Sequence, residues 1–240
     1  MLQTFSEYVT FPKFWNDFVL KHVPEAQIRF RKNNWFWRYL PKRKSMVCTI
    51  GNTVWFYSVA EFNSLAKNGT LEPILGHEFM HLWQKKTGEI NWFLYGWPQT
   101  SVLILILWAI FSGPWSFLVL VILAFSPFYG KYRIDAECAA YKMELLIEMA
   151  RFRGFPISIV SDWFCGDVIR FYRILFSRTH WCMATPGFIK RKYFEDLRDF
   201  FGNILNALDR LAYVKENSYI TSVSGIYAEV LRYYFPLNNR

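Results

Sequence analysis

Histidine and cysteine are scarce in this sequence, which contains four of each among 240 residues. No two cysteines have CxxC spacing, so we expect neither a cysteine zinc site nor a thiol redox motif. Scattered thiols of this kind are typical of a reducing compartment. The first residues also lack a basic segment followed by an apolar one, and we therefore expect no secretory signal peptide.

Charged side chains are absent from residues 90–130. Within this stretch, two nearly continuous apolar runs at 101–112 and 115–125 are separated by a Gly-Pro pair, which should break a helix. Each run is shorter than the roughly 20 residues that a membrane-spanning helix needs. We interpret residues 92–129 as an apolar helical hairpin that enters and leaves a membrane on the same side. A true crossing and a pair of buried core helices are the alternatives.

Positive charge exceeds negative charge, with a formal net charge of +9 and a pI near 9.4, which favours anionic partners. Aromatic residues make up 20% of the chain, and tryptophan and tyrosine favour membrane–water boundaries. Residues 29–44 combine basic with aromatic side chains, which predicts binding to an anionic membrane surface. An ordinary solvated loop is the alternative. We expect no specific nucleic-acid partner, because no nucleic-acid-binding motif accompanies the cluster.

The motif around which the chain is organised is HExxH, formed by His77, Glu78 and His81. Residues four apart share one face of a helix, so the two histidines can point their imidazoles at one zinc ion. Glu78 then lies close enough to the metal to act on a water molecule there as general base. Apolar neighbours at helical spacing, such as Leu75 and Phe79, predict that this helix packs in a core.

The residues before the motif predict a β-hairpin at 46–57. A helix should follow, because Ser58 and Glu61 have the spacing of a capping box. Thr70 can cap the next helix, which carries the motif to about Lys86. This order is typical of a compact zincin catalytic module. A strand edge beside the motif helix would let a substrate backbone add as an extra strand.

Two histidines leave a hydrolytic zinc site one protein ligand short. A third histidine of the HExxHxxGxxH pattern is excluded, because Gln84 and Thr87 occupy its glycine and histidine positions. The remaining source is a carboxylate on a second helix after the apolar stretch. The candidates there are Asp135 and Glu137.

Helical periodicity favours one of these candidates. At 100° per residue, Glu137 falls on a polar face with Glu144 and Glu148, whereas Asp135 falls on the apolar face. A buried carboxylate needs a partner, which for Asp135 would be the zinc ion or Lys142 on the same face. Periodicity alone therefore selects Asp135.

The helix HEFMHLWQ, the apolar stretch and a later helix with the pattern R-x-x-x-E-x-x-A-Y together resemble zinc metallopeptidases encoded by bacteriophages and bacteria. The resemblance covers about residues 46–150. It implies a zincin fold whose third ligand is a glutamate, so that zinc is held by His77, His81 and Glu137 with Glu78 as general base. The residues that carry it are His77, Glu78, His81, Arg133, Glu137 and Tyr141.

We therefore expect an α+β fold in two parts. Residues 1–150 would form a mainly helical zincin-like module that contains the β-hairpin and the apolar hairpin, and residues 151–240 a helical C-terminal region. His180 lies in this second part, and we interpret it as a structural or surface histidine. Further helices are expected within 1–28, where Pro24 ends the segment, and at 189–212 and 222–234.

The expected function is hydrolysis of peptide bonds by a zinc-dependent peptidase, with a peptide or protein as substrate. We expect it at an anionic membrane surface, on the cytoplasmic side of the host cell, or in association with the virion. The alternative is a membrane-associated structural or virion protein in which a structural or vestigial zinc site stabilises the fold.

Overall fold

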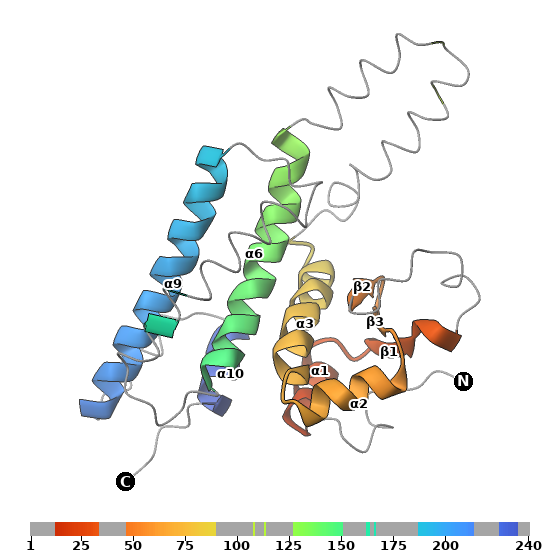
Figure 1. Ribbon diagram of the computed structural model, residues 1–240, viewed down its shortest axis with the longest axis horizontal. Coiled ribbons are helices and arrows are strands. Elements are labelled where there is room, and N and C mark those ends of the chain that lie inside the picture. The colour runs from red at the N-terminus through yellow and green to blue at the C-terminus, as the bar shows by residue number, and fades with distance from the viewer. Residues whose placement is uncertain are drawn as a thin grey trace. The chain divides into compact units, whose positions relative to one another are not determined.

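Figure 1 shows a computed structural model of the chain. Helices account for 76% of the residues it describes, and three strands form one small mixed sheet. The α+β class is therefore confirmed at this coarse level. The described residues are 13–33, 47–89, 127–150, 187–213 and 226–234, with the single positions 108, 113, 162, 163 and 166.

The chain divides into two units. The elements of the first are α1 (Lys13–His22), β1 (Gln27–Phe30), the short helix η2 (Arg31–Asn33), β2 (Cys48–Ile50), β3 (Thr53–Phe56), α2 (Val59–Lys67) and α3 (Leu71–Thr87), with Met143–Glu148 of α6. The elements of the second are the rest of α6 (Pro127–Ala150), α9 (Gly187–Tyr213) and α10 (Ile226–Tyr234).

The sheet of the first unit has the order β1-β3-β2. β1 is parallel to the central strand β3, and β2 is antiparallel to it. β2 and β3 form the hairpin predicted at 46–57, and Gly51 in its turn has a φ of 64°, which favours glycine. Among the described strands, β2 pairs only with β3 and so lies at an edge of the sheet.

β1 was not predicted from the sequence, which indicated within residues 1–28 only a helical segment that ends at Pro24. α1 ends at His22, and Pro24 lies in the turn that follows. β1 then buries Ile28 and Phe30 while Arg29 points outward. This alternation is typical of a strand, but four residues are too few for it to stand out in the sequence.

The described residues of the basic cluster at 29–44 have different environments. Arg29 places its guanidinium 5.8 Å from the centroid of the Trp55 ring. Arg31 is buried, whereas Lys32 is exposed. Arg31 therefore does not belong to the outward-facing basic surface that the sequence suggested. Residues 34–44 lie outside the described part of the chain.

The capping signals before the motif helix are confirmed in position. Ser58 is the N-cap of α2, and its hydroxyl oxygen accepts a hydrogen bond from the backbone N–H of Glu61 at 3.2 Å. The Glu61 carboxylate in turn accepts from the backbone N–H of Tyr57 at 2.9 Å. Thr70 is the N-cap residue of α3, but its hydroxyl donates to the carbonyl oxygen of Leu65 and makes no cap bond to α3. The predicted side-chain cap is therefore wrong.

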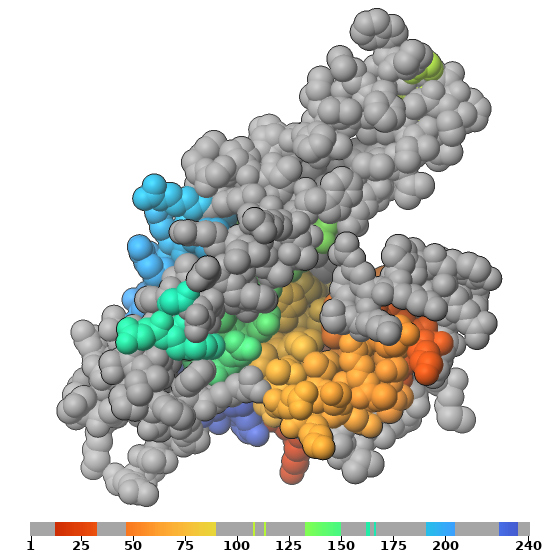
Figure 2. All heavy atoms as spheres, in the orientation of Figure 1, coloured from red at the N-terminus to blue at the C-terminus, as the bar shows by residue number. Residues whose placement is uncertain are grey.

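α3 is the central helix of the first unit, where it contacts α1, α2 and β2 (Figure 1). Trp15 and Phe18 of α1 pack on Phe79 of α3, with ring centroids 6.1 Å and 4.8 Å from that ring. The predicted burial of the motif helix is thus confirmed, and large aromatic side chains contribute much of its packing energy. α2 contacts α3, and its residues Asn63 and Ser64 are exposed. The orange surface in Figure 2 includes the atoms of α2.

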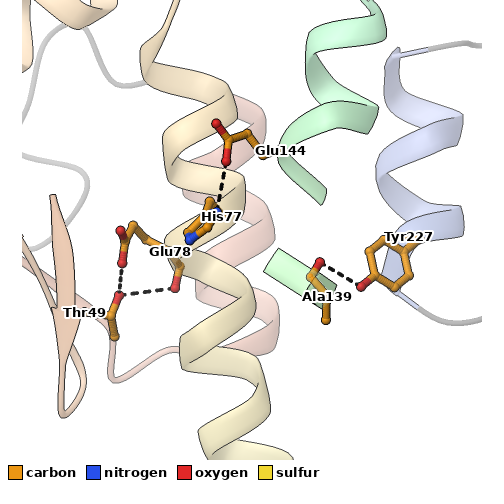
Figure 3. Close-up of polar contacts among 6 residues, drawn as sticks. All are labelled: Thr49, His77, Glu78, Ala139, Glu144 and Tyr227. Carbon is orange, nitrogen blue, oxygen red and sulfur yellow. Dashed lines mark hydrogen bonds and ion pairs between the residues drawn. The ribbon is translucent and has the colours of Figure 1, made fainter. Parts of the chain in front are cut away.

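In the second unit, α6 is joined to α9 and α10 by polar contacts. Lys142 forms an ion pair with Asp196 at 2.6 Å, and its ammonium lies 5.1 Å from the centroid of the Phe200 ring. The hydroxyl of Tyr227 on α10 donates to the carbonyl oxygen of Ala139 at 2.9 Å (Figure 3). α9 and α10 confirm the C-terminal helices predicted at 189–212 and within 222–234, and the latter helix begins at residue 226.

The predicted apolar hairpin lies almost entirely outside the described residues. α6 begins at Pro127, so the last three residues of the predicted range 92–129 belong to this helix. None of the described helices combines the length and the apolar character needed to cross a membrane.

Candidate metal centre

His77 and His81 lie one turn apart on α3, and their rings meet edge to face with centroids 5.0 Å apart. His81 is buried, with 5% of its surface exposed. α3 is continuous from Leu71 to Thr87, so His77 and His81, which are four residues apart, lie on the same face of this helix.

The residue before the motif brings the second helix close. A methyl group on Gly76 would overlap the side chain of Ile147 on α6 and would lie 3.1 Å from Cγ of Met143. Because glycine has no Cβ, the backbone of α3 can approach α6 at this point, within the first unit. This close approach brings Glu144 of α6 into contact with His77.

Glu144 is the carboxylate that contacts the first histidine directly. Its Oε2 lies 2.9 Å from Nδ1 of His77 (Figure 3). A carboxylate accepts hydrogen bonds, so Nδ1 of His77 is the donor, and Nε2 is the ring nitrogen left to bind a metal. Gln84 has the same relation to His81, with Oε1 3.4 Å from Nδ1, which is a weaker bond. In both histidines Nδ1 makes the contact, an arrangement typical of rings that bind a metal through Nε2.

Glu137 completes the group. α6 is one continuous helix, so Glu137 lies about two turns before Glu144 on the same face. It is only 5% exposed although it is an acidic residue. One ligand atom from each of His77, His81 and Glu137 lies within 4.8 Å of the other two, and the three could hold one metal ion. The residues predicted as ligands are therefore together, and their role in binding zinc stays a prediction.

Asp135, the alternative ligand, is not in this group. Its side chain is exposed and accepts a hydrogen bond from the hydroxyl of Tyr193 on α9. Lys142, its other predicted partner, pairs instead with Asp196. The placement of Asp135 on a buried apolar face is therefore wrong. Burial, and after it the hydrogen bond to Asp135, raise the pKa of the Tyr193 hydroxyl.

Glu78 is 6% exposed and lies where α3 meets the edge strand β2. The hydroxyl of Thr49 on β2 is 2.6 Å from Oε2 of Glu78 and 3.3 Å from the carbonyl oxygen of the same residue (Figure 3). The predicted general base is thus buried, and one of its carboxylate oxygens is held by a hydrogen-bond donor from the sheet.

The pKa of the Cys48 thiol depends in part on the charge of Glu78. Burial first, and the negative charge of Glu78 second, raise the pKa of the Cys48 thiol to about 11, and the positive charge of Arg31 opposes this rise. The thiol is therefore protonated near neutral pH, which makes it a poor nucleophile and metal ligand. The buried residues Glu78 and Arg31 therefore both lie close enough to the Cys48 thiol for their charges to change its pKa.

Two other residues of the motif pattern lie on α6. Tyr141 is buried and Arg133 is partly buried. His180 lies outside the described residues. Sequence reasoning missed Gly76, Glu144 and Thr49. For Glu144 a signal did exist, because it shares a helix face with Glu137.

Comparisons with known protein families, with curated proteins and with solved structures find no match for this chain. The resemblance to phage and bacterial metallopeptidases thus stays a prediction based on the motif residues.

If Glu144 orients His77 for a metal, replacing it should weaken metal binding. We expect Glu144→Ala to reduce zinc affinity by about 10- to 100-fold, the usual effect of losing an outer-shell carboxylate. Glu144→Gln should lose less zinc affinity, because its amide oxygen can still accept a hydrogen bond from Nδ1 of His77. Competition with a fluorescent chelator measures the affinity. Glu72→Ala, a change of the same type in the first turn of α3, is the control, and equal affinities in Glu144→Ala and this control would contradict the role.

Proposed function

We propose that this protein is a zinc-dependent peptidase. The observation that carries the proposal is the convergence of His77, His81 and Glu137, with the buried carboxylate of Glu78 next to the first histidine in the chain. Two imidazoles and one carboxylate form a donor set typical of catalytic zinc, whereas structural sites are closed by four protein ligands. The Nδ1 acceptors Glu144 and Gln84 support the same assignment.

The chemistry follows from the position of Glu78. A bound zinc ion would supply a Lewis acid that polarises a water molecule and the substrate carbonyl. Glu78 takes one proton from the water as its oxygen attacks the peptide carbonyl carbon. Glu78 then gives this proton to the amide nitrogen as the C–N bond breaks. The products are a carboxylic acid and an amine, and Glu78 returns to its starting state.

The edge strand gives the proposed peptidase a place for its substrate. β2 contacts α3 through Thr49 and Glu78, and within the described residues its outer edge is not paired with another strand. An extended peptide can add to such an edge through backbone hydrogen bonds, which do not depend on side-chain identity. Ile50, which is 53% exposed on β2, would add apolar contact with the peptide.

Membrane association belongs to the proposal as an expectation. It is based on the apolar stretch at 92–129 and the basic cluster at 29–44, most of which lie outside the described residues.

The proposal is tested by metal content together with proteolysis. We expect the purified full chain to bind about one zinc ion and to cleave a casein probe. His81→Ala should lose both properties, because three ligands cannot be reduced to two without a large loss of affinity. His22→Gln, which changes a histidine outside the group, is the control and should retain both.

The possible results separate the two functions that the sequence suggested. Wild-type protein that binds no zinc, or full occupancy in His81→Ala, would contradict the metal centre itself. One zinc per chain without cleavage of any protein probe would instead favour the structural or vestigial site.

A further inference from the structure

We propose that Thr49 is a positioning residue that holds Glu78 in the orientation needed for proton transfer. The inference rests on the proposed function and extends it to a residue outside the HExxH motif. Its basis is the 2.6 Å contact between Oγ1 of Thr49 and Oε2 of Glu78 (Figure 3). This contact joins the edge strand β2 to the helix that carries the proposed ligands.

The Thr49 hydroxyl has two acceptors but only one proton. Its distance to Oε2 of Glu78 is 2.6 Å, and its distance to the backbone carbonyl oxygen of Glu78 is 3.3 Å. Hydrogen bonds to a carboxylate are shorter and stronger than those to a neutral acceptor, so the Thr49 hydroxyl donates its hydrogen bond to Oε2 of Glu78. Oε2 thus already accepts one hydrogen bond, which favours Oε1 as the oxygen that takes a proton from water.

The position of the hydroxyl is itself fixed by the sheet. Thr49 is the central residue of β2, and it lies opposite Val54 on β3, whose side chain is buried. Its β-branched side chain has a stiff first torsion. Glu78, in contrast, has three side-chain torsions, and proton transfer requires its carboxylate to be placed within about 0.5 Å. A rigid donor on the strand therefore limits the orientations of a flexible base.

The same contact joins the base to the proposed substrate edge. Because Thr49 and the exposed Ile50 are adjacent on β2, a peptide that adds to this strand would bind next to the residue that holds the base. If Thr49 served packing alone, Thr49→Val would leave catalysis unchanged, since valine has nearly the same shape as threonine and lacks only the hydroxyl.

Two matched pairs isolate the hydroxyl in the zinc-loaded full chain. Wild type and Thr49→Val differ by a hydroxyl against a methyl group, and Thr49→Ser and Thr49→Ala differ by a hydroxyl against a hydrogen. Within each pair, we expect loss of the hydroxyl to lower kcat on a fluorogenic peptide by about 10- to 100-fold, with KM and zinc affinity unchanged. In a Glu78→Gln background the same substitution should have little further effect, because the base is already gone.

A second readout does not require peptidase activity. A hydroxamic acid gives up its proton when it binds the metal of such a site, so its affinity depends on a well-placed base. We expect Thr49→Val to bind acetohydroxamate about 10-fold more weakly than wild type. Thr49→Ser should retain wild-type affinity.

The outcomes distinguish this inference from the proposed function. Equal kcat and equal acetohydroxamate affinity within both pairs, in a chain that cleaves peptides, would overturn the role of Thr49 alone. Additive losses in the Glu78→Gln background would assign Thr49 to packing and would also overturn it. If zinc-loaded wild type cleaves no peptide, the proposed function fails, and the acetohydroxamate comparison decides the role of Thr49. A chain that binds no zinc would overturn both.

Discussion

Glu78→Gln is expected to lower the kcat of peptide hydrolysis by about 10²- to 10⁴-fold, the usual contribution of a positioned general base. Glutamine has nearly the same volume as glutamate, so the buried side chain keeps its packing at the junction of α3 and β2. Its amide oxygen can still accept the hydrogen bond from Thr49. What it loses is the ability to take a proton from water, so the loss appears in kcat and leaves KM nearly unchanged.

Zinc content should be unaffected in the same variant, because Glu78 is not one of the three residues that could hold the metal. The measurement pairs metal analysis with kinetics on one protein preparation. Glu72→Gln, which removes a carboxylate from the first turn of the same helix, is the matched control and should retain full activity. Unchanged turnover in Glu78→Gln would show that another group acts as the base.

The sequence was sufficient for the local features of the first unit. The hairpin of β2 and β3, the start of α2 at Ser58 and the extent of α3 all depend on neighbouring residues: a glycine turn, a capping hydroxyl and a helical apolar period. β1 was missed because its strand character depends on pairing with β3, which lies 26 residues later in the chain. The apolar pattern of a four-residue segment does not indicate a partner strand so far along the chain.

The residues around the motif were missed for a similar reason. Thr49, Gly76 and Glu144 each act through a contact with a different element, and their types alone are common in strands and helices. Only the motif histidines could be identified directly, since their spacing on one helix is enough to define a shared face.

The helical wheel of α6 failed because the described side chains of this helix, at 133–149, are buried or partly buried on most of its circumference. Ile134, Ala136 and Glu137 are all buried although they point in different directions, and Asp135 is the exception. A division into one polar and one apolar face assumes that one side meets solvent. On α6 the acidic side faces the histidines of α3 through Glu144, and the exposed position carries the aspartate that bonds to Tyr193.

Glu137→Gln is therefore expected to lower zinc affinity by more than about 100-fold, beyond the range typical of an outer-shell change. An amide oxygen is a neutral and weaker donor to zinc than a carboxylate, while the shape of the buried side chain is retained. Asp135→Asn, two residues away on the same helix, is the matched control. Its side chain is exposed, and its amide oxygen can still accept from Tyr193, so zinc affinity should be unchanged and stability should change by less than about 1 kcal/mol.

Zinc retention during dialysis against a mild chelator compares the two variants directly, and thermal unfolding of the metal-free proteins checks that both are folded. Because both substitutions replace a carboxylate with an amide on α6, a difference between them cannot come from the change in net charge. It must come from which side chain faces His77 and His81. Loss of zinc from Asp135→Asn with retention by Glu137→Gln would reverse the assignment and would require α6 to be rotated from the position in which Glu144 contacts His77.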